Sequence, residues 1–263
     1  MSTEHPHHHG CHDDHICWGG GHPHDCRHEL SVEHLSVRYG KTEALTDICF
    51  RARCGHTLAL IGANGAGKST LLHALAGLLR GRTGQILWNG SPLHRTRQEI
   101  AFMPQRSEVD WKFPLTVRQL VAMGRYPALG IWGSLRQHDR DIIDKALSTL
   151  QLEELQARQI GELSGGQQQR AFLARALAQE AHILLLDEPF TGLDVPGMTA
   201  LAELLRNLAA EGRLVIASHH DLATAPAIFD KTLLLRRSAV AYGDTADILT
   251  EENLQRTFGT AHE

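Results

Sequence analysis

One stretch of glycines, GANGAGKS from Gly62 to Ser69, restricts the folds open to this chain more than any other feature. It fits the pattern GxxxxGK[ST], and it stands between a short apolar run, TLALI, and a segment with helical apolar spacing, STLLHALAGLL. Glycines in that context let backbone N–H groups curl around phosphate oxygens. An ordinary glycine-rich turn between a strand and a helix would require neither the lysine nor the serine. The stretch therefore predicts a nucleotide-binding loop.

Individual positions of this loop have separate expected roles. We expect Lys68 to reach the β- and γ-phosphates of ATP and the hydroxyl of Ser69 to ligate Mg²⁺. The helix that follows places its positive dipole end beside the phosphates. The residues expected to bind the nucleotide here are Gly62, Asn64, Gly65, Gly67, Lys68, Ser69 and Thr70.

A second motif, ILLLDE at 183–188, supplies the carboxylates that the glycine loop lacks. Its four apolar residues predict a buried strand, which leaves Asp187 at the carboxyl end, where α/β sheets bind ligands. Asp187 is expected to hold Mg²⁺ through water, and Glu188 to polarise the attacking water. A strand-end acidic pair can also be a helix cap or a solvated turn, but the preceding phosphate loop favours the catalytic interpretation.

The rest of the chain alternates between strand and helix patterns. LSVEHLSVRYG alternates like an edge strand, whereas TLALIGA, AHILLLDEP and GRLVIASHHDL are typical of strands buried on both faces. Between about 114 and 160, TVRQLVAMGR and HDRDIIDKALSTLQL have helical spacing. Strands that alternate with helices predict an α/β fold with a parallel sheet and right-handed crossovers.

Composition excludes several classes of function. The net charge of -4 gives no electrostatic reason to expect a nucleic-acid partner. No apolar run approaches the roughly 20 residues that span a bilayer. The first residues, MSTEHPHHHG, lack the apolar stretch of a signal peptide, so we expect that the chain is not exported and reaches a membrane only through a partner.

Residues 1–28 differ in composition from everything that follows. Histidine, cysteine and aspartate crowd together with few aliphatic side chains, so we expect this tail to be disordered without a ligand. Imidazole and thiolate suit Zn²⁺ better than Mn²⁺. The candidate zinc ligands are His7, His8, His9, Cys11, His12, Cys17 and Cys26. A purification tag, a solvated tail without function and non-specific capture of nickel or copper are the alternatives.

The motif LSGGQ at 163–167, followed by QQRAFLARAL, identifies a family resemblance. Ser164 and the amides of Gly165 and Gly166 begin a helix whose N-terminus can receive a phosphate. The motif resembles the signature of ABC ATPases, in which that phosphate belongs to ATP held by the other subunit. The resemblance therefore implies a homodimer joined through ATP, with Ser164, Gly166 and Gln167 contacting the nucleotide across the interface.

Other positions match the same family one at a time. Tyr39, in VRYG, is similar to the aromatic residue that stacks on adenine, although a tyrosine at a strand end can simply pack. Gln105, in FMPQR, resembles the glutamine that touches Mg²⁺ and the attacking water. Asp194, in GLD, matches the loop that crosses between subunits. SHHDL offers two histidines for the γ-phosphate contact, and the usual spacing before Asp-Leu favours His220 over His219.

The resemblance also implies the fold and the reaction. It predicts a P-loop NTPase of the ABC ATPase type over 29–263: a mixed-sheet core, a helical subdomain at about 106–162 and a small antiparallel β lobe. The implied reaction is hydrolysis of ATP to ADP and phosphate, with Glu188, His220 and Gln105 as the catalytic side chains and Ser69, Gln105 and Asp187 around Mg²⁺.

Longer stretches resemble the divalent-metal import branch of that family. They are PQRSEVDW from 104 with the following FP and TV pairs, QIGELSGGQQQR, and the ending from LLLRRSAVAYGD to TFG. The resemblance implies a permease, an extracytoplasmic metal-binding protein acting indirectly, and a peripheral position on the cytoplasmic face of the inner membrane. SEVDW favours manganese or iron, and the tail favours zinc. An exporter ATPase and a soluble ABC ATPase of cluster assembly remain the alternatives.

Overall fold

The computed structural model describes residues 28–93, 97–130 and 133–259. The tail proposed to bind zinc lies outside the described residues, apart from His28. No helix in these three ranges combines the length and the apolar character needed to cross a membrane.

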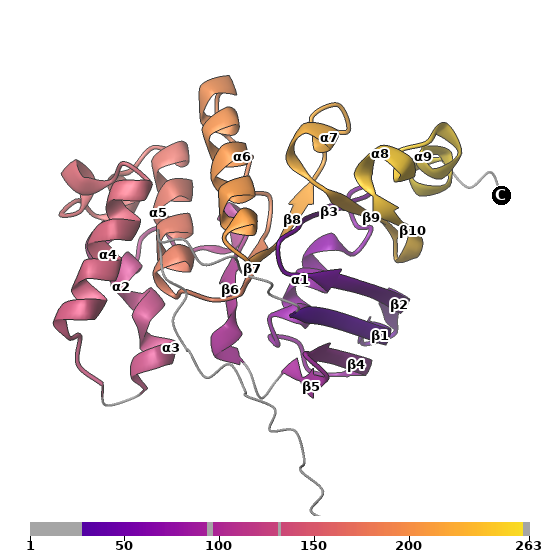
Figure 1. The fold of residues 1–263 in the computed structure, drawn as a ribbon, viewed down its shortest axis with the longest axis horizontal. Helices are drawn as coiled ribbons and strands as arrows, with labels where there is room; N and C mark the ends of the chain where they lie inside the picture. Colours follow the sequence, from indigo (N-terminus) through magenta and orange to yellow (C-terminus); the bar gives the residue numbers. More distant parts are fainter. Residues whose placement is uncertain (1–27, 94–96, 131–132, 260–263) are drawn as a thin grey trace, which may run out of the picture.

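A six-stranded mixed sheet forms the centre of the molecule (Figure 1). Five neighbouring strands are parallel, and the last strand along the chain pairs antiparallel at one edge. In spatial order the strands are β10 (Ser238–Asp244), β9 (Lys231–Arg236), β3 (Thr57–Ile61), β8 (Leu214–His219), β7 (Ile183–Leu186) and β6 (Ile100–Met103). Every residue of β3, β7 and β8 is buried, as their unbroken apolar runs predict.

A second, antiparallel sheet of four strands packs beside the first. Its order is β2 (Thr42–Arg53), β1 (Glu29–Tyr39), β4 (Arg82–Trp88) and β5 (Ser91–Pro92). The expectation that LSVEHLSVRYG is an edge strand is wrong, because β1 pairs with β2 on one side and β4 on the other. Alternation of apolar and polar residues indicates that one face of a strand packs on a core. It does not indicate whether the strand has a hydrogen-bonded neighbour on each side.

Helices cover the sheet and divide the core in two. They are α1 (Lys68–Leu75), α2 (Val117–Ala122), α3 (Tyr126–Leu129), α4 (Gln137–Thr149), α5 (Gly165–Ala178), α6 (Val195–Ala210), α7 (Ala225–Ile228), α8 (Thr245–Ile248) and α9 (Glu251–Phe258). In β7, Leu184 and Leu186 join the core under α5 and α6, whereas Ile183 and Leu185 join the core under α1 and the antiparallel sheet. Successive side chains of a strand point to opposite faces, so one strand supplies both cores.

The predicted helical segments occur as α2 and α4. Figure 1 shows both helices gathered with α5 on one side of the sheet, away from the antiparallel sheet. The bounds 106–162 for a separate helical subdomain stay a prediction; α5, which begins after them, packs against α2 and α4.

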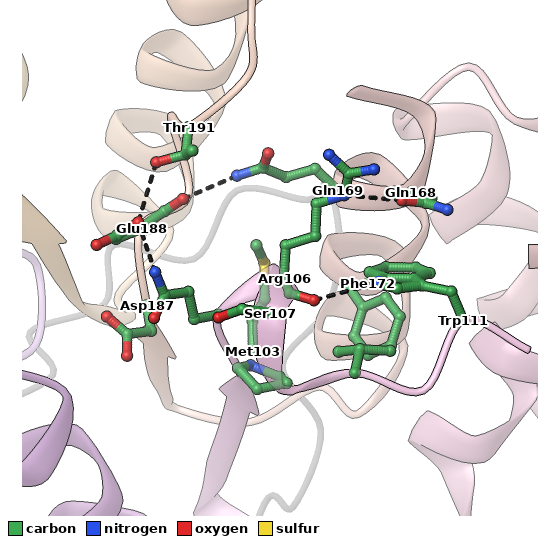
Figure 2. Close-up of a pocket in the computed structure, with 13 residues that line it drawn as sticks. Met103, Arg106, Ser107, Trp111, Gln168, Gln169, Phe172, Asp187, Glu188 and Thr191 are labelled. Atoms are coloured by element: carbon green, nitrogen blue, oxygen red, sulfur yellow. Dashed lines mark hydrogen bonds between the residues drawn. The ribbon is translucent and has the colours of Figure 1, made fainter. Parts of the chain in front are cut away.

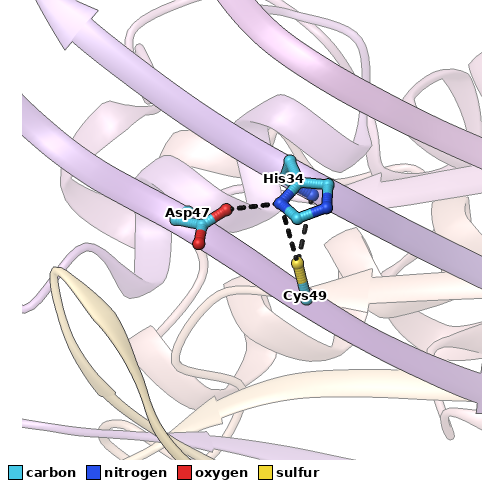
Figure 3. Close-up of side chains that lie close together, drawn as sticks. All are labelled: His34, Asp47 and Cys49. Atoms are coloured by element: carbon cyan, nitrogen blue, oxygen red, sulfur yellow. Dashed lines mark hydrogen bonds and ion pairs between the residues drawn. The ribbon is translucent and has the colours of Figure 1, made fainter.

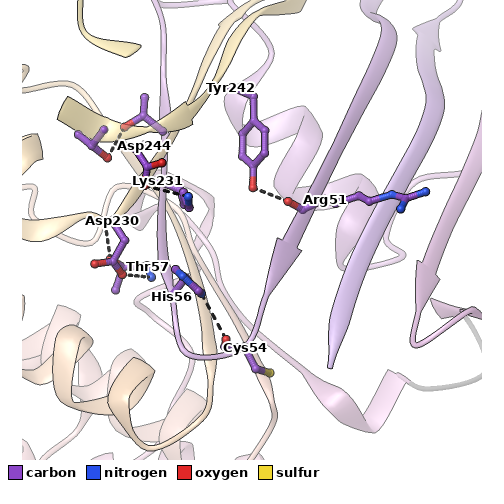
Figure 4. Close-up of polar contacts among 10 residues, drawn as sticks. Arg51, Cys54, His56, Thr57, Asp230, Lys231, Tyr242 and Asp244 are labelled. Carbon is purple, nitrogen blue, oxygen red and sulfur yellow. Dashed lines mark hydrogen bonds and ion pairs between the residues drawn. The ribbon is translucent and has the colours of Figure 1, made fainter. Parts of the chain in front are cut away.

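Polar contacts join the C-terminal strands to the antiparallel sheet and to β3 (Figure 4). The Asp230 carboxylate accepts hydrogen bonds from the backbone N–H of Thr57 at 2.8 Å and from its hydroxyl at 3.0 Å. The Tyr242 hydroxyl donates to the carbonyl of Arg51 on β2. The Asp230 bonds fix the start of β3, the strand that presents the glycine loop, and the Tyr242 bond joins β10 to β2.

Candidate nucleotide-binding and hydrolysis site

The glycine loop lies between the carboxyl end of β3 and the first turn of α1, as predicted. Gly65 and Gly67 have positive φ angles of 78° and 102°, which glycine adopts without steric cost. At Gly62 a Cβ atom would lie 2.3 Å from the carbonyl oxygen of Leu235, so the loop starts against β9 where only glycine fits. The loop backbone is therefore shaped by glycine at three of the predicted positions.

Lys68 folds back over this loop. Its Nζ donates to the carbonyl oxygens of Gly62 at 2.8 Å and Ala63 at 3.1 Å. Burial lowers the pKa of Lys68 below its usual range, and the nearby carboxylates of Glu188 and Asp187 oppose that shift. The ammonium group is thus held over the loop, within electrostatic reach of the acidic pair after β7.

The acidic pair is organised by Ser218, at the end of the neighbouring strand β8. Its hydroxyl donates to Asp187 Oδ1 at 2.6 Å and accepts from the backbone N–H of Glu188 at 2.6 Å. Asp187 is 1% exposed, whereas Glu188 is half-buried at the edge of the pocket. The same two-residue turn therefore holds one carboxylate in the interior and turns the other towards the solvent side.

Glu188 lies among polar side chains from two further elements (Figure 2). Gln105 Nε2 donates to Glu188 Oε2 at 2.9 Å, and Gln169 of α5 donates to the Glu188 carbonyl at 3.0 Å. The Thr191 hydroxyl is 3.3 Å from the same Oε2. Glu188 itself has a φ of 49°, in the left-handed region that costs free energy outside glycine. Contacts to its carboxylate and to its backbone carbonyl hold Glu188 in this strained conformation.

The residues predicted to hold Mg²⁺ fit that ion. Asp187 Oδ2 is buried and has no hydrogen-bond partner in the described part of the chain, so it is available to a cation or its water. The hydroxyl of Ser69, the amide oxygen of Gln105 and the carboxylate of Asp187 are oxygen donors, which Mg²⁺ prefers.

The two histidines after β8 have different surroundings. His219 is 4% exposed; its ring packs against Phe190 and Phe229, and its Nε2 lies 3.0 Å from Thr224 Oγ1. His220 is exposed to solvent. His219 therefore packs in the interior, whereas the choice of His220 for a phosphate contact stays a prediction.

The signature motif begins α5, as predicted. The Ser164 hydroxyl accepts from the N–H of Gln167 at 3.4 Å, and the Gln167 side chain accepts from the N–H of Ser164 at 2.9 Å, which is a reciprocal capping box. Asp194 caps α6 by accepting from the N–H of Gly197 at 3.0 Å. Ser164 and Asp194 both lie in exposed positions.

A pocket of about 450 Å³ opens beside the acidic pair (Figure 2). Polar side chains, including Gln105 and Glu188, line one part, and the Trp111 and Phe172 rings, 5.3 Å apart, line another. Of the predicted residues, the structure brings Gln105, Asp187 and Glu188 into one pocket. Tyr39 ends β1 with its side chain 51% exposed and does not line that pocket.

Comparisons with known proteins agree with this geometry. A family model described as ABC transporter matches residues 45–191. The chain belongs to the ABC transporter family.

The relatives cover nearly the whole chain. The manganese transport system ATP-binding protein MntB of Halalkalibacterium halodurans is 41% identical over 87% of this chain and 91% of its own length. The chelated iron transport system membrane protein YfeB of Yersinia pestis is 42% identical over 90% of this chain and 81% of its own. A solved ABC transporter described as metal-chelate type, in an inward-facing conformation, is 35% identical with a TM-score of 0.77, covering 88% of this chain and 89% of that one.

Family membership confirms the predicted ABC ATPase fold and the predicted reaction. The ATP-binding subunit of an ABC transporter hydrolyses ATP with Mg²⁺ and works with a transmembrane permease. The roles of the glycine loop, the acidic pair and the LSGGQ helix in that reaction stay predictions.

Sequence reasoning missed three residues around Glu188. Ser218, Gln169 and Thr191 all hydrogen-bond to Glu188, and Ser218 also bonds to Asp187. Ser218 had a usable signal, because it ends a buried strand next to the acidic pair's own strand. Gln169 was hidden among the consecutive glutamines of SGGQQQR, in which the sequence alone does not show which one faces the site.

Proposed function

We propose that this chain powers the uptake of a divalent transition metal, with manganese or iron as the cargo. The observation that carries the proposal is the 41% identity, over 87% of this chain, to an ATP-binding protein of a manganese transport system. The chelated-iron relative supports the same class. An exporter or a soluble cluster-assembly ATPase would leave this shared likeness to metal transport systems unexplained.

The proposed reaction uses two copies of the chain. Each copy binds ATP on its glycine loop, with Lys68 on the outer phosphates and Tyr39 stacked against adenine. Ser164, Gly166 and Gln167 of the second copy close over the same phosphates, because the N-terminus of their helix carries positive dipole charge that attracts anions. Asp194 lies in the loop that crosses the interface. Neither nucleotide is enclosed until both copies meet, so ATP binding drives dimer closure.

Hydrolysis then depends on positioning and charge. Glu188 accepts a proton from the attacking water, while Gln105 and His220 hold that water in line with the γ-phosphate. Asp187 and Ser69 would hold Mg²⁺, which neutralises charge on the phosphates when bound. Since Gln105 already hydrogen-bonds Glu188 and begins the segment leading into α2, its movement links hydrolysis to the helical side of the molecule.

The helical side is the part we assign to the permease. On this proposal the chain lies peripherally on the cytoplasmic face of the inner membrane, and an extracytoplasmic metal-binding protein delivers cargo from the opposite side. The metal itself never touches the residues of the nucleotide site.

Metal uptake in cells tests the proposal. We expect Glu188→Gln to abolish accumulation of manganese or iron, whereas Glu203→Gln, a matched change on the exposed face of α6, leaves uptake unchanged. Zinc is scored in the same cells. Loss of zinc uptake alone would contradict the assigned cargo, and unchanged uptake of all three metals would contradict import.

We also infer that the tail at 1–28 buffers or senses metal and adjusts the ATPase rate. The concentration of imidazole and thiol ligands there supports this inference. Deleting 1–28 is expected to shift the dependence of transport on metal concentration. An identical dependence in the deleted protein would show that the tail has no such role.

A further inference from the structure

Outside the nucleotide site, three metal-binding side chains of different chemistry converge on the antiparallel sheet. His34 on β1 and Asp47 and Cys49 on β2 each offer one ligand atom, and these atoms lie within 4.8 Å of one another (Figure 3). All three side chains are exposed, so an ion could reach them from solvent. Nothing in the ATPase reaction uses them.

Two β-bulges create this cluster. In the first bulge, Glu33 and His34 of β1 stand opposite a single residue of β2, Cys49. In the second bulge, Thr46 and Asp47 of β2 stand opposite a single residue of β1, Ser36. Each strand gains one residue, so the pair Val37 and Leu45 returns to the register of Val32 and Phe50, and a further shift follows between Val37 and Arg38. A regular ladder would not place the three side chains together, and bulges are a common way to re-aim a side chain.

The bulged residues adopt unusual backbone conformations that surrounding contacts fix. His34 and Asp47 have φ angles of 51° and 52°, in the left-handed region that His and Asp adopt more readily than most residues. The Asp47 N–H donates to Ser36 Oγ at 2.9 Å. At Gly84 of β4 a Cβ atom would lie 2.3 Å from the His34 carbonyl, so β4 packs directly against the first bulge. The backbone carrying the ligands is therefore preorganised.

The distances suit a tetrahedral ion with small adjustments. His34 Nδ1 is 2.7 Å from Asp47 Oδ1 and 3.7 Å from Cys49 Sγ. Zinc bonds of about 2.0–2.3 Å place tetrahedral ligand atoms roughly 3.3–3.7 Å apart. The imidazole–carboxylate pair would open slightly, and the imidazole–sulfur distance already fits. The backbone N–H of His34 also donates to Cys49 Sγ at 3.1 Å, which holds the sulfur beside the other two ligands.

We propose that His34, Asp47 and Cys49 form a binding site for a borderline divalent cation such as Zn²⁺, open at its fourth position. The site goes beyond the proposed transport function, because it lies on the chain's own surface, away from the nucleotide pocket. One imidazole, one carboxylate and one thiolate form a set that binds Zn²⁺ in preference to Mn²⁺. The open position admits water or a ligand from another group.

Alkylation of the Cys49 thiol measures metal binding at this site in the full-length protein. Iodoacetamide reacts with the thiolate, and bound zinc blocks it. Peptide mass spectrometry follows Cys49 separately from Cys11, Cys17 and Cys26, and a metal buffer fixes free Zn²⁺ so that the tail cannot deplete it. We expect Zn²⁺ to slow alkylation of Cys49 by at least about tenfold and equal free Mn²⁺ to leave it unchanged.

Substitutions that keep the bulges complete the test. Asn tolerates positive φ, so His34→Asn and Asp47→Asn remove a ligand without straining the backbone. Both are expected to abolish zinc protection of Cys49 while retaining ATPase activity, which reports an intact fold; His138→Asn, an exposed histidine of α4, keeps the protection. The proposal would be overturned if Zn²⁺ did not protect Cys49 of the wild-type protein from alkylation. It would also be overturned if Zn²⁺ protected Cys49 equally in both ligand variants, or if Mn²⁺ protected Cys49 as well as Zn²⁺ does.

Discussion

At the scale of single residues, Ser218 connects the Asp187 carboxylate to the backbone of Glu188 in the nucleotide site. Its hydroxyl donates to Asp187 and accepts from the Glu188 backbone, and Ser218 is 1% exposed. Removing the hydroxyl would leave a buried carboxylate oxygen and a backbone N–H without partners. Such buried polar groups cost about 1–3 kcal/mol each.

We therefore expect Ser218→Ala to lower kcat for ATP by about 10- to 100-fold, because the acidic pair loses its alignment with the reacting water. The KM for ATP should change little, since the glycine loop is untouched. Thr191→Ala, which removes the longer 3.3 Å contact to Glu188, serves as the comparison. Steady-state ATPase assays measure both; equal losses in the two variants would show that Ser218 has no special positioning role.

His219 gives the protein a pH-dependent stability. Burial, and then the neighbouring His220, lower its pKa, while Asp221 opposes the shift. The unfolded chain consequently binds a proton at this histidine near the ordinary pKa of about 6.5, whereas the folded protein binds it only at lower pH. The contribution of His219 to the free energy of unfolding is therefore fully present above about pH 6.5 and is lost as the pH falls below that value.

Urea unfolding between pH 7.5 and 5.5 checks this expectation. His219→Phe removes the titrating group from the aromatic cluster, so its stability should fall less steeply over this range, by a slope equivalent to at most about one proton. If His219→Phe and wild type share one slope, the buried histidine does not control acid sensitivity.

Residues within one motif could be predicted from the sequence, whereas their partners from other strands could not. Lys68 and Asp187 follow from local patterns, because a phosphate loop and a strand end each encode their own geometry. Ser218 and Gln169 act through elements brought alongside by sheet order and helix packing. The His34 and Asp47 bulges were also missed, because the extra residue in each strand is visible only in the register.

At the scale of elements, the capped start of α5 has two functions that compete for one side chain. The Ser164 hydroxyl accepts from the N–H of Gln167 and so stabilises α5, and it lies where we propose that a second copy's ATP docks. Aspartate caps a helix about as well as serine does. A carboxylate there would nevertheless repel the phosphates of ATP.

Ser164→Asp and Ser164→Ala should therefore separate stability from dimer formation. We expect the aspartate variant to unfold within about 0.5 kcal/mol of wild type and the alanine variant to lose about 1 kcal/mol. In a Glu188→Gln background, ATP should drive dimerisation of the parent but not of the Ser164→Asp protein, as measured by size-exclusion chromatography. An ATP-dependent dimer of the Ser164→Asp protein would contradict the proposed interface.

The sequence predicted the elements correctly wherever the pattern of apolar residues followed the pattern of burial. β3, β7 and β8 are buried on both faces, and α2 and α4 follow their helical spacing. The place of β1 within its sheet was wrong, because pairing with β4 depends on a segment more than forty residues away along the chain. The alternation of apolar and polar residues within β1 does not indicate which distant strand pairs with it.

At the scale of the whole molecule, one buried guanidinium joins the helical side to α5. Arg125, which follows α2, donates to Asp139 of α4 at 3.0 Å, to Glu180 at 2.8 Å and to the carbonyl of Ala178 at 2.8 Å. The side chains of Arg125 and Asp139 are each only 7% exposed. By contrast, Arg118 and Asp144 form an ion pair in the same region with both side chains exposed.

Arg125→Met should therefore destabilise the protein far more than Arg118→Met. The first change leaves two carboxylates without their cation in the interior and should cost about 3–5 kcal/mol. The second removes a solvent-screened pair and should cost no more than about 1 kcal/mol. Adding Glu180→Gln to Arg125→Met should recover part of the loss, because it removes one of the stranded charges. Chemical denaturation measures all three; if the two arginine variants lost equal stability, this cluster would not be what ties the helical side to α5.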